Sequence, residues 1–211
     1  MELGILDYGA GNLRSVNNAF EALGRSSRLI ATAADFDQVD VLIFPGQGAF
    51  GDCVKFLKHR DLWTPLQEWL KAERPYLGIC LGYQLLFEGS EECPGVQGLA
   101  AAGGVVRRFD PGSGLKIPHM GWNAVQWSAP FSNWWQGLPN PSHLYFVHSY
   151  YPDVADSSEV LCTAEYGRDF AAGIARPHLM AVQFHPEKSQ TLGLKLLGNA
   201  LTVLEGAGDP A

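Results

Sequence analysis

The sequence lacks long hydrophobic runs and contains few charged residues. Of its 211 residues, 46% are hydrophobic and 18% are charged. Its clean apolar runs are about as long as a strand, well short of the ~20 residues that cross a membrane as a helix. The first residues, M-E-L-G-I-L-D, have neither the basic nor the long apolar region of a signal peptide. These absences predict a globular protein without a membrane segment, and we expect it in the cytoplasm.

The chain also lacks internal repeats and any Ser/Pro/Gly-rich linker. A length of 211 residues suits one α/β domain. A chain of this size can bury a sufficient core without cross-links. We therefore expect a single domain over residues 1–211.

Basic residues are few and scattered. The 15 Lys and Arg are outnumbered by 22 Asp and Glu, which gives a net charge of −7. A surface that binds nucleic acid needs clustered Lys and Arg, and the chain has no basic run beyond Arg107-Arg108. Nucleic acid is therefore excluded as a main partner.

Paired cysteines are absent as well. A zinc knuckle or a thioredoxin-type site would need a C-x-x-C pair, and none occurs among Cys53, Cys80, Cys93 and Cys162. A free cysteine is most often a small buried hydrophobe. We expect reduced thiols and no structural metal.

Short apolar runs alternate with helical patterns in the first half of the chain. Strands are predicted at 2–6, 28–31, 41–44 and 76–79. Helices are predicted at 13–23, 49–59, 62–73 and 81–88. This alternation predicts an α/β fold in which helices flank a mostly parallel central sheet.

The second half reads differently, because strand patterns follow one another with little helix between them. These strands are predicted at 104–109, 122–127, 144–147, 160–166, 170–175 and 179–184. We expect them to extend the sheet in antiparallel fashion. A closing helix is predicted at about 190–205.

One cysteine lies between two glycines, in P-Y-L-G-I-C-L-G-Y-Q at 75–84. The form G-x-C-x-G between a strand and a helix is that of a nucleophile elbow, in which a sharp turn exposes the nucleophile. The flanking glycines would let neighbouring segments pass close by. A helix that starts after Cys80 would stabilise a thiolate with its positive end, and the Leu81 N–H could bind an oxyanion.

A base for this thiol is offered by A-V-Q-F-H-P-E at 181–187. In extended backbone, residues i and i+2 point to the same side, so His185 and Glu187 would emerge together. Glu187 could then accept the Nδ1–H of His185 and leave Nε2 facing the thiol. Alone, H-P-E is more often a surface turn. With the cysteine elbow it predicts a nucleophile, a base and an orienting carboxylate.

A glycine-rich turn follows the strand at 41–44, in F-P-G-Q-G-A-F. Its backbone N–H groups, at Gly46 and Gln47, could complete an oxyanion hole with Leu81. A phosphate loop is excluded because no G-x-x-x-x-G-K-[ST] occurs. A metal held by Cys80 and His185 lacks any helical or hairpin ligand spacing, so we expect neither metal nor cofactor.

Three segments in this order, P-G-Q-G-A-F, P-Y-L-G-I-C-L-G-Y-Q and V-Q-F-H-P-E-K-S, resemble the class I (triad-type) glutamine amidotransferases. Further segments, D-Y-G-A-G-N-L-R-S-V at 7–16, K-I-P-H-M-G-W-N at 116–123 and Y-F-V-H-S-Y at 145–150, are similar to the glutaminase subunits of imidazole glycerol phosphate synthase. The resemblance spans residues 2 to about 205. It implies a three-layer, flavodoxin-like fold.

The resemblance also implies roles for individual residues. Cys80 would be the nucleophile, His185 the base and Glu187 its orienter. The other positions would be Gly46, Gln47 and Leu81 for the oxyanion hole; Gly48, Gln84, Ser149 and Tyr150 for glutamine; and Asn12, Trp122, Tyr145 and Lys188 for the partner interface or ammonia path. Two positions depart from the family pattern, since Gln47 replaces a small apolar residue and Tyr83 a common Met.

The activity implied by the resemblance is hydrolysis of L-glutamine through a cysteine thioester. The ammonia would pass to a cyclase subunit of (β/α)₈-barrel fold in a heterodimer. From a ribonucleotide substrate, the cyclase would make imidazole glycerol phosphate and aminoimidazole carboxamide ribotide in histidine biosynthesis. Three alternatives remain: a stand-alone cysteine hydrolase of γ-glutamyl peptidase type, a binding module on the same fold, and a glutaminase for anthranilate or guanylate synthesis. The marker segments at 7–16 and 116–123 oppose the stand-alone hydrolase, and the presence of Cys80, His185 and Glu187 opposes the binding module. Within the family, the resemblance of D-Y-G-A-G-N-L and Y-F-V-H-S-Y favours the imidazole glycerol phosphate synthases.

Overall fold

Apolar residues of the central strands alternate between the two faces of one sheet. In β3 (Val41–Phe44), Val41 and Ile43 join one hydrophobic cluster, whereas Leu42 and Phe44 join a second. The alternation arises because successive residues of a strand point to opposite faces. The sheet is therefore buried on both sides, as is usual for parallel strands covered by helices.

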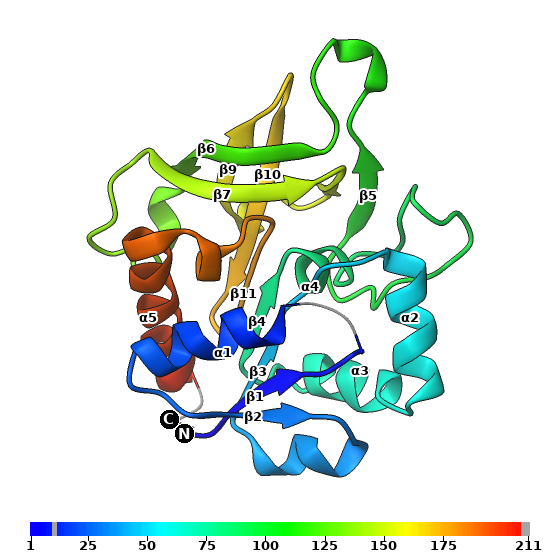
Figure 1. Ribbon diagram of the computed structural model, residues 1–211, viewed down its shortest axis with the longest axis vertical. Helices are drawn as coiled ribbons and strands as arrows, with labels where there is room; N and C mark the ends of the chain where they lie inside the picture. Colours follow the sequence, from blue (N-terminus) through cyan, green and yellow to red (C-terminus); the bar gives the residue numbers. More distant parts are fainter. Residues whose placement is uncertain (10–11, 208–211) are drawn as a thin grey trace.

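The computed structural model describes residues 1–9 and 12–207 (Figure 1). Residues 10 and 11 of the marker segment at 7–16 lie outside the described part. The other strands are β1 (Leu3–Leu6), β2 (Ser27–Ile30), β4 (Tyr76–Ile79), β5 (Gly104–Arg108), β6 (His119–Trp127), β7 (Ser142–His148), β8 (Tyr150–Val154), β9 (Val160–Glu165), β10 (Asp169–Arg176) and β11 (Leu179–Val182). The α-helices are α1 (Leu13–Ala22), α2 (Phe50–His59), α3 (Trp63–Lys71), α4 (Leu81–Gln84) and α5 (Gln190–Ala207). Short 3₁₀ turns span Ala33–Gln38, Pro111–Ser113, Ala129–Phe131, Ser157–Glu159 and Pro186–Lys188.

The described strands form a nine-stranded sheet in the order β2-β1-β3-β4-β11-β10-β9-β6-β7. Neighbours from β2 to β11 run parallel. From β11 to β7 the neighbours are antiparallel. A separate antiparallel pair joins β5 and β8. The predicted α/β fold, with a parallel core and an antiparallel extension from the second half, is confirmed.

Helices cover both faces of the parallel strands (Figure 1). Phe20 of α1 and Leu197 of α5 belong to the hydrophobic cluster on one face. Leu57 of α2 and Trp69 of α3 belong to the cluster on the other face. Three layers result, as predicted. In the described part of the chain, no helix is both long enough and apolar enough to cross a bilayer.

Two elements differ from the sequence prediction. The helix predicted at 81–88 ends after one turn, as α4. In a longer helix, the carbonyls of Leu85 and Leu86 would accept N–H groups from the next turn. Here they accept the N–H groups of Leu99 and Ala101 instead. Strand β8 was not predicted. It contains Pro152, a residue that favours turns over strands in the sequence. The strand forms because its backbone pairs with that of β5, a contact that the sequence does not reveal.

Candidate active site

Three loops singled out in the sequence leave neighbouring strands at one edge of the sheet. Cys80 follows β4, residues 183–185 follow β11, and residues 45–48 follow β3. Because β3, β4 and β11 are adjacent and parallel, their carboxyl ends meet and place the loops side by side. Residues 103 positions apart in the sequence therefore come into contact.

The turn at Cys80 has the backbone geometry of an elbow. Cys80 has φ 55° and ψ −97°, a conformation that side-chain-bearing residues rarely adopt. Its N–H donates to the Val182 carbonyl at 2.7 Å, which ties the turn to β11. A Cβ atom added at Gly78 would lie 2.8 Å from the Gly82 oxygen, and one at Gly82 would lie 2.1 Å from the Phe44 oxygen. The flanking glycines therefore allow the close approach that was predicted.

The helix after Cys80 contributes less charge than predicted. Because α4 spans only Leu81–Gln84, few aligned peptide dipoles add up at its N-terminus. Stabilisation of a Cys80 thiolate therefore depends more on individual groups near the sulfur than on a long helix.

His185 and Glu187 form a buried pair, as predicted, but Pro186–Lys188 is a 3₁₀ turn and not the extended backbone on which the prediction was based. His185 Nδ1 donates to Glu187 Oε1 at 2.8 Å, and each side chain is only 2% exposed. The backbone of His185 is held on both sides, because its N–H donates to the Tyr145 carbonyl at 2.8 Å and its carbonyl accepts the Ser189 hydroxyl at 2.7 Å. Since a carboxylate can only accept, Nδ1 carries a hydrogen and Nε2 is the nitrogen left for chemistry.

The surroundings of His185 favour its protonated form. Burial lowers its pKa, but the Cys80 sulfur and the Glu187 carboxylate outweigh this and raise the pKa to about 9. Nε2 of His185 is buried and has no hydrogen-bond partner among the described residues. The imidazole therefore lies close enough to the Cys80 sulfur for the two groups to interact. Such a group can hold a proton and then donate it.

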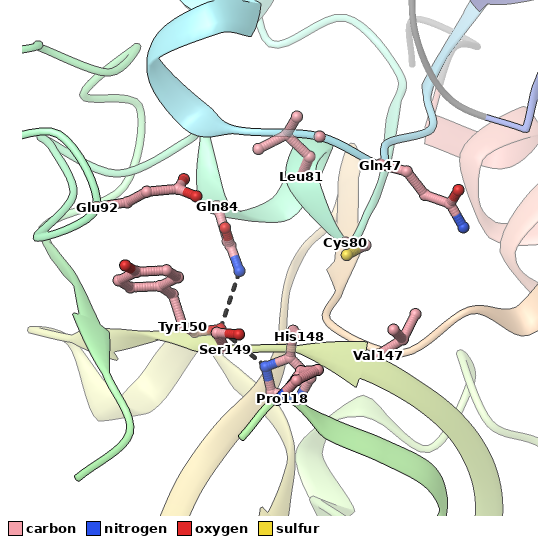
Figure 2. A pocket seen from close by; sticks show the side chains of 11 residues that line it. Gln47, Cys80, Leu81, Gln84, Glu92, Pro118, Val147, His148, Ser149 and Tyr150 are labelled. Atoms are coloured by element: carbon pink, nitrogen blue, oxygen red, sulfur yellow. Dashed lines mark hydrogen bonds between the residues drawn. The ribbon is translucent and has the colours of Figure 1, made fainter. Parts of the chain in front are cut away.

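A pocket of about 380 Å³ opens beside the elbow (Figure 2). Figure 2 shows Gln84 extending from α4 toward Tyr150, to whose carbonyl it donates a hydrogen bond of 2.9 Å. The predicted residues that line the pocket are Gln47, Gly48, Cys80, Leu81, Gln84, Ser149 and Tyr150. Seven of the ten residues expected for the triad, oxyanion hole and glutamine site thus surround one cavity, whereas His185, Glu187 and Gly46 are not part of its wall.

Glu92 also lines this pocket and was missed in the sequence. It lies in S-E-E-C-P-G, which reads as a surface turn. Its Oε2 accepts the Phe50 N–H at 2.8 Å, so the start of α2 holds the loop against the site. No signal in the sequence relates Glu92 to Cys80, because the contact depends on how the loop after α4 folds back.

The expected oxyanion segment lies against the elbow. A Cβ atom added at Gly46 would lie 2.4 Å from Leu81 Cβ, so these two backbones touch. The Gln47 N–H, however, donates to the Tyr8 hydroxyl at 2.7 Å. In this arrangement the Gln47 amide is already engaged, and its use by an oxyanion would require that bond to break. The assignment of Gln47 to the oxyanion hole stays a prediction.

Two further histidines lie beside the pocket. His148 Nδ1 donates to the Tyr150 carbonyl at 2.8 Å, so its Nε2 accepts from His119 Nδ1 at 2.9 Å. Burial lowers the pKa of His148 to about 3 and that of His119 to about 4. Both imidazoles are therefore neutral at pH 7. In the described residues, no three His, Cys, Asp or Glu side chains are grouped so that they could hold a metal ion.

The four residues expected at a partner interface lie on four different elements. Trp122 and Tyr145 are cross-strand neighbours on β6 and β7, with ring centroids 6.2 Å apart. Trp122 is 48% exposed and Met120, two residues earlier, is 55% exposed. Lys188 closes the 3₁₀ turn that follows His185. Asn12 caps α1 with its side chain, a structural role besides any partner contact.

Comparison with known proteins gives a consistent picture. The model of the family "Glutamine amidotransferase class-I" matches residues 4–202. A relative from Syntrophotalea carbinolica, named imidazole glycerol phosphate synthase subunit HisH, is 48% identical over 200 residues, which cover 92% of this chain and 97% of that protein. A relative from Arabidopsis thaliana, named imidazole glycerol phosphate synthase hisHF, chloroplastic, is 44% identical over 195 residues, which cover 92% of this chain and 33% of that protein.

A solved structure described as a glutamine amidotransferase superposes with a TM-score of 0.74. The two chains are 18% identical, and the match covers 96% of this chain and 98% of the other. At that identity the likeness establishes the fold, while the family follows from the sequence matches. The chain belongs to the class-I glutamine amidotransferase family and, within it, to the HisH subunits of imidazole glycerol phosphate synthase.

Proposed function

We propose that the chain hydrolyses L-glutamine to glutamate and ammonia and passes the ammonia to a cyclase subunit. Cys80 is the nucleophile, His185 transfers protons and Glu187 orients His185. One observation carries the proposal: His185, held by Glu187 in a buried pair, interacts with Cys80, whose strained elbow forms part of the wall of a pocket. Membership of the glutamine amidotransferase family supports glutamine as the substrate.

The pocket has groups that suit an α-amino acid. Glu92 is the one carboxylate among the described residues that line it, and it can bind the α-ammonium group. Gln84, Ser149 and Tyr150 supply amide, hydroxyl and backbone groups for the other polar atoms. This arrangement would bind the amino-acid end near Glu92 and leave the side-chain amide toward Cys80.

Catalysis begins with attack of the Cys80 thiolate on the side-chain amide carbon of glutamine. The carbonyl oxygen becomes an oxyanion, which would be bound by the Leu81 N–H and, once the Gln47 N–H leaves the Tyr8 hydroxyl, by the amides of the 46–48 segment. One well-aimed donor of this kind contributes about 10²–10³ in rate. The proton on His185 Nε2 then moves to the leaving nitrogen, the C–N bond breaks and ammonia departs.

The second half of the reaction releases glutamate. A γ-glutamyl thioester remains on Cys80, and His185, now neutral, removes a proton from water as the water attacks the thioester carbon. Collapse of this intermediate frees glutamate and restores the thiolate and imidazolium. Glu187 keeps Nδ1 protonated throughout, so Nε2 is the atom that exchanges protons.

Ammonia in neutral bulk water is mostly ammonium, which is not a nucleophile. Direct transfer to a second active site avoids this loss. The Arabidopsis thaliana relative contains a further two thirds of sequence beyond the part that matches this chain. We propose that the partner here is a separate cyclase of (β/α)₈-barrel fold, bound as a heterodimer.

The exposed apolar side chains of β6 are suited to this contact. Met120 and Trp122 are two residues apart in a strand and so share one face. They pair across the sheet with Val147 and Tyr145, and Val147 lines the pocket. A partner that covers this face would therefore lie next to the site that releases ammonia.

The catalytic assignment is tested by Cys80→Ser and Glu187→Gln. Cys80→Ser should lower glutamine hydrolysis by about 10³-fold or more while ammonia-driven synthesis by the complex continues. Glu187→Gln removes the orienting charge and should cost roughly 10²–10⁴-fold in kcat. Glutamine hydrolysis by Cys80→Ser at a rate close to that of the unmodified chain would end the proposal.

The partner surface is tested by Met120→Glu. The matched control is Leu29→Glu, since Leu29 is also exposed, at 53%, but lies on β2 at the far end of the sheet. Met120→Glu should abolish stimulation of glutamine hydrolysis by a barrel cyclase and its ribonucleotide substrate, whereas Leu29→Glu should not. Equal stimulation of both variants would place the partner elsewhere.

We also propose that residues 1–211 fold as a single domain. Support comes from the two hydrophobic clusters, which lie on opposite faces of one continuous sheet. Unfolding by denaturant should then give coincident transitions by fluorescence and circular dichroism.

A further inference from the structure

We propose that Gln183 holds and stabilises the Cys80 thiolate through a hydrogen bond to the sulfur. The inference deepens the proposed function, on which it rests. Gln183 is fully buried and follows β11 directly, two residues before His185. Its Nε2 donates to Cys80 Sγ at 3.5 Å, an ordinary distance for an N–H to sulfur bond. Gln183 does not line the pocket, so it contacts the sulfur from the buried interior and leaves the pocket side of Sγ open to substrate.

The amide of Gln183 is oriented by a chain of hydrogen bonds that starts at a backbone carbonyl. The Tyr150 oxygen can only accept, so the Gln84 group that lies 2.9 Å from it must be the NH₂ group. The same Gln84 Nε2 lies 3.0 Å from Gln183 Oε1 and therefore donates to it. With its oxygen turned to Gln84, Gln183 must present its NH₂ group to Cys80. The direction of the N–H toward sulfur is thus fixed by geometry.

The backbone of Gln183 is fixed as well. Its N–H donates to the Ala172 carbonyl at 2.8 Å, which continues the pairing of β11 with β10. A fixed backbone and a side chain held at its oxygen leave little freedom at Nε2. The donor is therefore already in place before substrate binds, which is the condition for effective electrostatic stabilisation.

A hydrogen-bond donor at this distance favours the charged form of the thiol over the neutral form. The need for such a donor is clear from the fold, because α4 is a single turn and adds little of a helix dipole. On this basis Gln183 stabilises the thiolate by its hydrogen bond and restrains the position of Sγ. Gln84 then has two roles, since it lines the pocket and also aligns Gln183.

A purely structural role for Gln183 predicts a different outcome. A buried amide with satisfied hydrogen bonds could serve only to fill and stabilise the core, and its loss would lower stability without changing the titration of the sulfur. The test must therefore measure the reactivity of Cys80 as a function of pH, separately from folding and from turnover.

The test is the pH dependence of Cys80 alkylation by iodoacetamide in the full chain, measured by mass spectrometry in a Cys93→Ser background. That background removes Cys93, the one free cysteine that is not buried; of the three buried thiols, Cys80 lines the pocket, whereas Cys53 and Cys162 do not. Gln183→Met keeps the length of the side chain and removes the donor. Gln183→Glu keeps an acceptor for Gln84 and places a carboxylate oxygen beside the sulfur. Tyr76→Phe is the control, because it removes a buried hydrogen bond to the elbow, from the Tyr76 hydroxyl to Gly82, without touching the sulfur.

Gln183→Met should raise the midpoint of alkylation by about one pH unit, as expected for loss of a hydrogen bond to a charged group. Gln183→Glu should raise it further, and Tyr76→Phe should leave it unchanged. In the glutaminase assay both Gln183 variants should lower kcat about tenfold or more, with KM for glutamine within about twofold.

The proposal is overturned if Gln183→Met alkylates with the midpoint of the Tyr76→Phe control, whatever the midpoint of Gln183→Glu, whose carboxylate repels the thiolate in any case. If Gln183→Met does not fold, Gln183→Leu, which also lacks a donor and a charge, takes its place. Failure of the proposed function would appear separately, as glutamine hydrolysis that survives Cys80→Ser, because alkylation reports on the N–H to sulfur bond without any turnover.

Discussion

The hydroxyl group of Tyr8 makes two hydrogen bonds to one residue, Gln47. It accepts the Gln47 N–H at 2.7 Å and donates to the Gln47 carbonyl at 2.8 Å. Burial raises the pKa of Tyr8, so the hydroxyl keeps its hydrogen at neutral pH and both bonds can form together. Tyr8 comes from the loop after β1, whereas Gln47 comes from the loop after β3. The contact therefore couples the segment at 7–16 to the expected oxyanion segment.

Removal of this hydroxyl should free the Gln47 amide. Tyr8→Phe should raise glutamine hydrolysis by the isolated chain roughly three- to tenfold, the range expected for one net hydrogen bond, and should reduce the further stimulation by the partner. Tyr166→Phe is a fair control, because Tyr166 also donates to a backbone carbonyl, that of Lys116. Steady-state rates with and without the cyclase are the measurement. An unchanged basal rate in Tyr8→Phe would show that the contact does not restrain catalysis.

Glu92 should determine how tightly glutamine binds. Glu92→Gln can still accept the Phe50 N–H, so the loop should remain in place, but the negative charge that pairs with the α-ammonium group is lost. KM for glutamine should rise about 10- to 100-fold, as for loss of a charged hydrogen bond, with a smaller effect on kcat. Glu91→Gln serves as the control, since Glu91 bonds to Arg107 and does not line the pocket. Equal KM values for both variants would contradict the assignment.

The sequence was informative where local pattern decides structure. The strands predicted at 41–44 and 76–79 coincide with β3 and β4, because each is a short apolar run bounded by turn residues. The elbow at Cys80 and the spacing of His185 and Glu187 are likewise local. Once the parallel sheet is inferred, these residues are expected at neighbouring strand ends, which is where they lie.

Contacts made by folded-back loops could not be predicted in this way. Glu92 reaches the pocket only because the loop after α4 packs on the start of α2. The hydrogen bonds of Gln183 to Gln84 and Cys80 join residues 99 and 103 positions apart. Such contacts depend on the final packing of several elements, and a single sequence carries no local pattern for them.

The buried histidines should make the protein sensitive to acid. The pKa values of His148 and His119 are lowered, to about 3 and about 4, from the ordinary value of 6.5. Between pH 6.5 and these lowered pKa values, the two histidines bind more protons in the unfolded chain than in the folded one. The contribution of these two histidines to the free energy of unfolding is therefore complete above pH 6.5 and falls as the pH is lowered, by up to about 1.4 kcal/mol per pH unit for each group.

This pH dependence can be assigned by substitution. His119→Phe should flatten the fall in unfolding free energy between pH 6.5 and 4.5, because one of the two groups no longer titrates. His143→Asn, on the same strand as His148 but exposed, should not change the slope. Urea unfolding at several pH values gives the slopes directly. A fall of equal steepness in His119→Phe would assign the sensitivity to other groups.

Two glycines of α5 offer a matched test of how the His185 turn is held. A Cβ atom at Gly193 would lie 1.9 Å from the Pro186 carbonyl oxygen, whereas one at Gly198 meets only Leu23 at an ordinary 3.8 Å. Gly198→Ala should stabilise the chain by up to about 1 kcal/mol, since Ala is the better helix former. Gly193→Ala has the same propensity gain, but it should push Pro186 and the His185–Glu187 pair out of place. We expect a lower melting temperature and a kcat reduced by at least tenfold, with Gly198→Ala retaining full activity. If Gly193→Ala were as stable and active as Gly198→Ala, the packing of α5 on this turn would have no part in positioning the base.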